Sequence, residues 1–251
     1  MRIAAAERRT FDGNSALAGD PALRRYLSDM VGRYDLEVRQ TDLGHSYGEM
    51  AEPLITVLTT HAGRLPVNLL ILAYGVHDVR LGRATATYLS SRCPGEPLAF
   101  AVCDQGTAAA FTALSMINAY NHPRAMLIVA EQSAIHYEPA APAPIPQRHA
   151  AVGFLLDSSP QQRIHIDQHT DVDIDEAAKI LAEHDTKTLI VSRNLYPTAQ
   201  SLTDDVRQAP DGQPYTGVWW ELADAHREGR PLLLADYDPL LRYLCVATVS
   251  A

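Results

Sequence analysis

The stretch LAFAVCDQGTAAAFTALSMINAY, residues 98–120, decides the fold. It opens with a short continuous apolar run, residues 98–103, which is typical of a strand buried on both faces of a sheet. From residue 106 onward the side chains are small or apolar almost all round the helical circumference, which predicts a helix enclosed by other elements. A buried strand that leads directly into a buried helix indicates a layered α/β protein.

Similar apolar runs lie on both sides of this stretch. Further strands are predicted at 67–74, 125–130, 150–156, 163–166, 188–191, 232–235 and 243–247. Further helices are predicted at 47–61, 83–93, 175–184 and 216–228. Four prolines between 139 and 146 predict a loop, because proline neither pairs in a sheet nor continues a helix. Residues 1–46 are polar and weakly periodic, and only one short helix is predicted there, near 24–31.

The order strand–helix–strand–strand occurs twice, at 98–156 and at 188–248. This repetition indicates an internal duplication by pattern rather than by identity. Alternating helices and buried strands in both parts support the α/β class.

The composition excludes several classes of function. The 251 residues carry 30 acidic and 21 basic side chains, a net charge of -9, so a nucleic-acid role is disfavoured. No apolar stretch reaches the roughly 18 residues that a membrane span needs. Three cysteines at wide spacing predict neither a disulfide framework nor a zinc site. The first residues lack the apolar core of a signal peptide, and we expect a cytoplasmic protein.

Several segments resemble one known family. They are VNLLILAYGVHD at 67–78, the stretch at 98–120, RAMLIVAEQS at 124–133, HAAVGFLLDS at 149–158 and TLIVSRN at 188–194. They are similar to β-ketoacyl synthase III-type enzymes of the thiolase-like superfamily. The resemblance implies a layered αβαβα fold of two similar halves, 1–158 and a shortened 159–251. It also implies a dimer that pairs through the strand at 98–104.

The family's chemistry, as the resemblance implies it, needs three side chains. A Cys at a helix N-terminus attacks an acyl thioester, and a His and an Asn from the second half stabilise the carbanion. Here the nucleophile position falls on Gly106, on Thr107 or, with a shortened strand, on Gln105, whereas Cys103 is still inside the strand. The His position falls near Ser192 or Arg193, and the Asn loop falls near Gln213. All three catalytic positions are therefore interpreted as lost.

Chain-length-factor subunits in the wider family often carry Gln where the nucleophile should be, and Gln105 resembles that pattern. The leading hypothesis is therefore a non-catalytic subunit that pairs with an active ketosynthase in polyketide or fatty-acid-like biosynthesis. It would shape acyl-chain binding and help to receive the acyl carrier protein. No cofactor is expected apart from acyl-phosphopantetheine or coenzyme A as a possible ligand.

Two other functions stay open. One is an acyltransferase or thioester hydrolase that uses Cys103 or Thr107, with His77, His136 or His149 as the base. The other is a homodimeric acyl- or coenzyme A-binding module. The acyltransferase or hydrolase hypothesis has a competing interpretation, in which Cys103 is simply a small buried apolar residue near the end of a strand.

Three further sites have competing interpretations. Asp104, Gln105, Gly106 and Thr107 either bind an acyl carbonyl through exposed N–H groups or form an ordinary helix start with Asp104 as N-cap. Glu131 ends a buried strand, and either organises the elbow or braces loops. His165, Asp167 and His169 share one strand face, but a polar outer face is favoured over a metal site.

Overall fold

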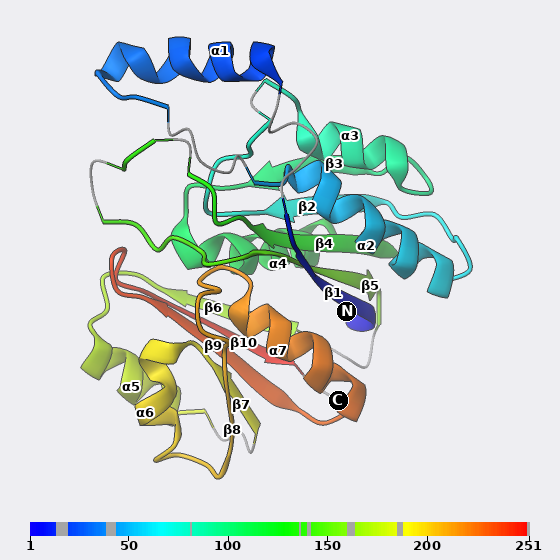
Figure 1. The fold of residues 1–251 in the computed structure, drawn as a ribbon. Helices are drawn as coiled ribbons and strands as arrows, with labels where there is room; N and C mark the ends of the chain where they lie inside the picture. Colours follow the sequence, from blue (N-terminus) through cyan, green and yellow to red (C-terminus); the bar gives the residue numbers. More distant parts are fainter. Residues whose placement is uncertain are drawn as a thin grey trace.

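A computed structural model describes residues 1–13, 20–38, 44–80, 82–135, 137–139, 142–159, 164–184 and 188–249. It contains two five-stranded sheets, shown in Figure 1. Sheet A contains, in spatial order, β1 (Arg2–Phe11), β5 (His149–Asp157), β4 (Arg124–Glu131), β2 (Leu69–Ala73) and β3 (Leu98–Val102). Sheet B contains, in the same way, β6 (Ile164–His169), β10 (Tyr243–Val249), β9 (Leu232–Asp238), β7 (Thr188–Val191) and β8 (Asp205–Gln208).

The two sheets repeat one topology. In each, the first three strands are antiparallel neighbours and the last three are parallel neighbours. The predicted duplication is present, but its predicted alignment is wrong. The strand at 188–191 corresponds to β2 and not to the strand at 98–103, because β7 and β2 hold the same place in their sheets. Sheet B is made from a shorter length of chain than sheet A.

Helices form three layers around the two sheets (Figure 1). The central layer holds α4 (Ala109–Tyr120) and α7 (Gly217–Ala225), and each contacts strands of both sheets. Outer helices α2 (Tyr47–His61) and α3 (Thr85–Arg92) cover sheet A, while α5 (Ile174–Ala182) and α6 (Tyr196–Ala199) cover sheet B. The predicted αβαβα arrangement is therefore confirmed. The remaining helical elements are α1 (Pro21–Val31), η2 (Gly32–Tyr34), η3 (Gly106–Ala108), η4 (Arg193–Leu195) and η5 (His226–Glu228).

The core lies mainly in the central layer. Trp219 of α7 is buried, and its ring centroid lies 4.8 Å from that of Phe111 on α4 and 6.1 Å from that of Phe154 on β5. The small residues of α4 let both sheets approach this helix closely, which confirms the predicted enclosed helix. Because α4 and α7 are held from both faces, their N-termini are fixed where the two halves meet.

The prediction for residues 1–46 is wrong in one respect. They contain β1, a ten-residue strand that pairs with β5 from Arg2 opposite Asp157 to Phe11 opposite His149. Only Ala6 in β1 is buried, because the strand lies at the edge of sheet A, so its sequence lacks the continuous apolar run of an interior strand.

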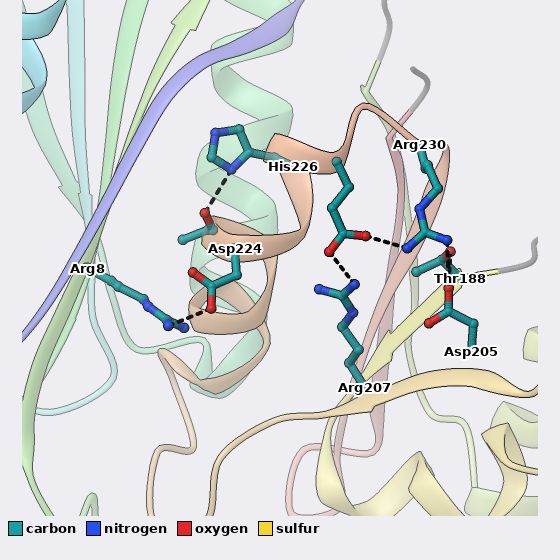
Figure 2. A network of polar contacts seen from close by, with 9 residues as sticks. Arg8, Thr188, Asp205, Arg207, Asp224, His226 and Arg230 are labelled. Carbon is teal, nitrogen blue, oxygen red and sulfur yellow. Dashed lines mark hydrogen bonds and ion pairs between the residues drawn. The ribbon is translucent and has the colours of Figure 1, made fainter.

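Charged side chains hold β1 and β8 in place (Figure 2). Arg8 reaches from β1 to α7, where it donates to the carbonyl of Trp220 at 3.0 Å and pairs with Asp224. At the other edge, Asp205 of β8 accepts from the Thr188 hydroxyl at 2.8 Å and pairs with Arg230 at 3.3 Å. Edge strands of both sheets are thus attached by polar contacts as well as by backbone pairing.

Candidate functional site

A buried carboxylate of the first half holds the start of the central helix of the second half. Glu131 ends β4 and is fully buried. Its Oε2 accepts from the backbone N–H groups of Tyr215 at 2.8 Å and Thr216 at 3.1 Å. Its Oε1 accepts from the Thr216 hydroxyl at 2.6 Å. The first turn of α7 therefore receives its cap from across the boundary between the halves.

The second half returns the same contact. Asp238 ends β9, the counterpart of β4, and its Oδ2 accepts from the backbone N–H of Thr107 at 3.3 Å, where the central helix of the first half begins. Its Oδ1 accepts from the N–H groups of Leu240 at 3.0 Å and Leu241 at 3.1 Å. We call the region defined by Glu131, Thr216, Asp238 and Thr107 the seam.

Residues 103–107, the elbow, carry the turn from β3 into the central helix. Gly106 has a φ of +54°, and a Cβ atom there would overlap the Asp238 carboxylate and lie 2.7 Å from Leu241 Cδ1. Glycine is therefore required by the backbone and by the space. One interpretation predicted that Asp104 caps the helix, and this is wrong. The N-cap position is Gln105, and the carboxylate that accepts from the first turn comes from Asp238.

A cavity of about 410 Å³ opens at the seam. Four residues singled out from the sequence lie on its wall, namely Thr107, Ser192, Arg193 and Gln213. The other lining residues are Pro142, Ala143, Pro144, Ile145, Asn194, Ala209, Pro210, Asp211, Gly212, Pro214, Val218, Asp236, Tyr237, Asp238, Pro239 and Leu240. We call it the seam cavity, and its size is that of a site for a small organic ligand.

Sequence reasoning missed the acidic side of this cavity. Asp236 and Asp238 lie on one face of β9, because they are two residues apart, and both are buried. The pKa of Asp236 is raised to about 7, chiefly by burial and also by the nearby Asp238 and Glu131 charges, against hydrogen bonds from Ser192 and the Tyr237 N–H. The sequence feature that could have revealed these carboxylates is the apolar run at 232–235 followed by Asp236 and Asp238, which resembles the end of β4 at Glu131.

The pKa of Glu131 is also raised to about 7, chiefly because burial removes water from the charged carboxylate. The hydrogen bonds from Thr216, Tyr215 and Gln213 act in the opposite direction. Gln213 donates to the Thr216 hydroxyl at 2.9 Å, so it belongs to the same network. The seam is thus an acidic, buried centre in which hydrogen bonds replace a cationic partner.

Cys103 and Gln105 point to other partners. The Cys103 thiol donates to Asp104 Oδ2 at 3.1 Å, and its pKa is raised by burial and by Asp104. Gln105 Oε1 accepts from the Thr112 hydroxyl at 2.6 Å, within the central helix. Neither residue is among the described residues that line the seam cavity.

The predicted basic partners also lie elsewhere in the described part of the chain. The His77 carbonyl accepts from Gln132 Nε2, and His149 Nδ1 accepts from the Ser133 N–H at 3.3 Å. Neither His77 nor His149 lines the seam cavity, and His136 is outside the described residues. His165 pairs with Asp167 at 3.2 Å on the outer strand β6.

The described residues hold no group of three or more His, Cys, Asp or Glu side chains placed to bind a metal ion. No described helix has both the length and the apolar character that crossing a bilayer requires.

Comparison with known proteins shows the fold. No family model and no curated protein matches the chain. Among solved structures it is similar to the tetronic acid condensing enzyme AbyA1, with a TM-score of 0.69, 14% identity and coverage of 100% and 99% of the two chains. It is also similar to the acyltransferase ChlB3, with a TM-score of 0.65, 13% identity and coverage of 100% and 97%. A third similar structure is the 3-oxoacyl-(acyl carrier protein) synthase III FabH from Pseudomonas aeruginosa PAO1, with a TM-score of 0.65, 16% identity and coverage of 99% and 98% of the two chains. The chain therefore has a thiolase-like fold of the β-ketoacyl synthase III type.

Proposed function

We propose that this chain is a ketosynthase-like subunit that does not condense acyl groups itself and that pairs with an active ketosynthase. The observation that carries the proposal is the elbow. Gly106 stands at one of the positions where the resemblance places the nucleophile, and the space that its side chain would fill belongs to the Asp238 carboxylate. A nucleophile cannot be accommodated there unless Asp238 moves.

The charge at the elbow also opposes acyl transfer. Attack on a thioester forms an oxyanion, which enzymes stabilise with free N–H groups. Here the Thr107 N–H is already bonded to Asp238, and an oxyanion at this point would meet a carboxylate. Cys103, the nearest thiol in sequence, has a raised pKa, so little of it is the reactive thiolate near neutral pH. Both features favour binding over catalysis.

The partner would pair along β3. This strand is the outer strand of sheet A, so one side of its backbone has no neighbour in the sheet. Leu98 on β3 is 52% exposed, and Phe100 contacts Tyr120, which is also exposed. An unpaired edge beside exposed apolar side chains is suited to pairing with another strand. The acyl chain, delivered by an acyl carrier protein, would then be received in part by the seam cavity.

The test is to co-express the chain with any ketosynthase that is encoded beside it and to measure the mass of the purified complex. A one-to-one heterodimer is expected. Leu98→Lys should weaken the heterodimer by placing a charge at the joined edge, whereas Leu202→Lys, at another exposed leucine, should not. A homodimer that does not bind the ketosynthase would contradict the proposal and favour the acyl- or coenzyme A-binding module. Turnover of an acyl thioester by the chain alone would favour the acyltransferase or hydrolase.

A further inference from the structure

The seam cavity holds two buried carboxylates that no described cation neutralises. Asp236 is 3% exposed and Asp238 is 2% exposed. Their hydrogen-bond partners are the Ser192 hydroxyl and backbone N–H groups. The cationic side chain on the cavity wall, Arg193, pairs with Asp211 at 2.9 Å, and both of these side chains are mostly exposed. Two buried acidic side chains thus face a cavity whose described cationic side chain, Arg193, is paired with Asp211 at the rim.

This arrangement is costly in an empty cavity. Burying an ionised carboxylate without a cation is unfavourable unless several hydrogen bonds compensate. Asp238 accepts three backbone hydrogen bonds, whereas Asp236 is stabilised by the Ser192 hydroxyl and by the Tyr237 N–H, which also donates to Ser192 Oγ at 3.1 Å. A cationic group placed between these carboxylates would therefore gain more than a neutral group of the same size.

An independent observation at the same wall also points to a ligand. Thr107 is 9% exposed and lines the cavity, and its hydroxyl has no hydrogen-bond partner among the described residues. Buried hydroxyl groups are nearly always paired, so an unpaired one beside a cavity marks a place for a polar atom. Its backbone N–H is bonded to Asp238, so Thr107 lies next to that carboxylate on the cavity wall.

The mouth of the cavity has the opposite character. Ile145 is 42% exposed and Leu240 is 53% exposed, and Pro142, Pro144 and Pro239 lie beside them on the wall. The cavity is therefore acidic where it is deeply buried, and where it meets solvent it carries these apolar side chains beside the Arg193–Asp211 pair. A ligand that fits this gradient has a polar, positively charged head and an aliphatic body.

We propose that the seam cavity binds an aliphatic primary amine, such as the amino end of an aminoacyl group. The ammonium group lies against Asp236 and Asp238 and donates to the Thr107 hydroxyl, and the aliphatic chain runs toward Ile145 and Leu240. This assignment deepens the proposed function and rests on it in one respect, namely that the cavity receives the acyl group. A carboxylate-bearing group is excluded, because it would meet two buried negative charges.

The test is calorimetric titration of the purified chain at pH 8.0 with hexylamine, hexanol and hexanoate, three probes of equal chain length. Hexylamine is expected to bind one-to-one and at least about tenfold more tightly than hexanol, because only the ammonium pairs with the carboxylates. Hexanoate is expected to give no saturable binding. Equal affinity for the three probes, or amine binding without a one-to-one limit, would overturn the assignment.

Two variants locate the binding. Asp236→Asn should abolish most of the preference for hexylamine over hexanol, whereas Asp175→Asn, in the exposed first turn of α5 and outside the cavity wall, should leave that preference within about twofold. If Asp236→Asn fails to fold, Thr107→Val, which keeps the side-chain shape, should still weaken hexylamine binding. Amine binding that neither variant changes would contradict the proposal. A heterodimer without amine binding would overturn this assignment alone, whereas amine binding without a heterodimer would overturn only the proposed partner.

Discussion

The Oε1 atom of Glu131 lies 2.6 Å from the hydroxyl oxygen of Thr216, although the two residues belong to different halves of the molecule. Asp238 makes the matching contact in the other direction, to the N–H of Thr107. Each half therefore ends a central strand of its sheet with the carboxylate that the other half's central helix needs at its first turn. The stability of the seam depends on the protonation of these acidic groups.

The first prediction concerns pH. The pKa values of Glu131 and Asp236 are raised to about 7 in the folded protein, above their ordinary values of 4.5 and 3.8. The folded state thus holds protons that the unfolded state has released. The free energy of unfolding should fall as pH rises from about 4.5 to 7, by up to about 1.4 kcal/mol per pH unit for each group. Urea unfolding at a series of pH values measures this slope.

Glu131→Gln should flatten part of that slope. The amide keeps an oxygen for the two backbone N–H groups and donates to the Thr216 hydroxyl, so it imitates the protonated carboxyl group. The variant should match the unchanged protein near pH 5 and should be more stable near pH 8. Asp175→Asn, in the exposed first turn of α5, is the control and should leave the slope as it is. An unchanged slope in Glu131→Gln would rule out this carboxyl group as a source of the pH dependence.

The second prediction concerns the elbow. Gly106→Ala should lower the free energy of unfolding by about 2–4 kcal/mol, since it adds both a strained φ and an overlap with Asp238. Gly229 is the matched control, because its φ is +63° and no atom lies within 4 Å of an added Cβ. Gly229→Ala should cost only about 1 kcal/mol. Equal losses in the two variants would mean that Asp238 does not fill the space at Gly106.

The third prediction concerns thiol reactivity. At pH 7.5, Cys103 should react with iodoacetamide more slowly than glutathione does, because burial and Asp104 raise the pKa of its thiol. Asp104→Asn should speed the reaction by removing the neighbouring charge. The buried Cys93 and Cys245, whose pKa values are also raised, should remain unlabelled in the folded protein. Stoichiometric labelling of Cys103 by an acyl thioester would contradict this picture and restore the enzyme hypothesis.

The fourth prediction concerns the contact in Figure 2 between β1 and α7. Arg8 donates to the Trp220 carbonyl, pairs with Asp224 and lies over the Trp220 ring at 4.7 Å from its centroid. Arg8→Gln should lower the free energy of unfolding by about 1–2 kcal/mol. Arg9→Gln, at the exposed neighbouring position, should change it by less than about 0.5 kcal/mol. A similar loss in both variants would show that overall charge, and not this contact, is responsible.

The interior strands could be predicted from the sequence, and so could two edge strands, β3 and β6, but β1 and β8 could not. The prediction that residues 98–103 form a strand buried on both faces is wrong, because β3 lies at the edge of sheet A and only Val102 in it is buried. Continuous apolar runs predict the interior strands at 67–74 and 125–130 and the enclosed helix of 106–120. The missed strands, β1 and β8, lie at sheet edges, and charged pairs such as Arg8–Asp224 and Arg230–Asp205 attach them in addition to their backbone pairing. Such pairs join residues far apart in sequence and leave no periodic pattern.

Some residues of the candidate site could be predicted from the sequence and others could not. The positions Thr107, Ser192, Arg193 and Gln213 could be located because the resemblance to β-ketoacyl synthase III-type enzymes places the family's catalytic positions there, and the structure brings all four to one cavity. The role of Asp238 could not be predicted. It depends on which helix N-terminus lies opposite the end of β9, and that relation exists only after the two halves have packed together.

The pairing of β1 with β5 has a consequence for how the protein is made. Arg2 lies opposite Asp157, so β1, which is synthesised before the other strands of sheet A, cannot pair with β5 until residues 149–157 have also emerged from the ribosome. At ordinary rates of translation this leaves β1 unpaired for roughly 10–30 s. During that time its backbone is open to a wrong strand, and its polar, arginine-rich sequence is the kind that resists such pairing. The polar, arginine-rich composition that kept β1 from being predicted thus also opposes wrong strand pairing in the nascent chain.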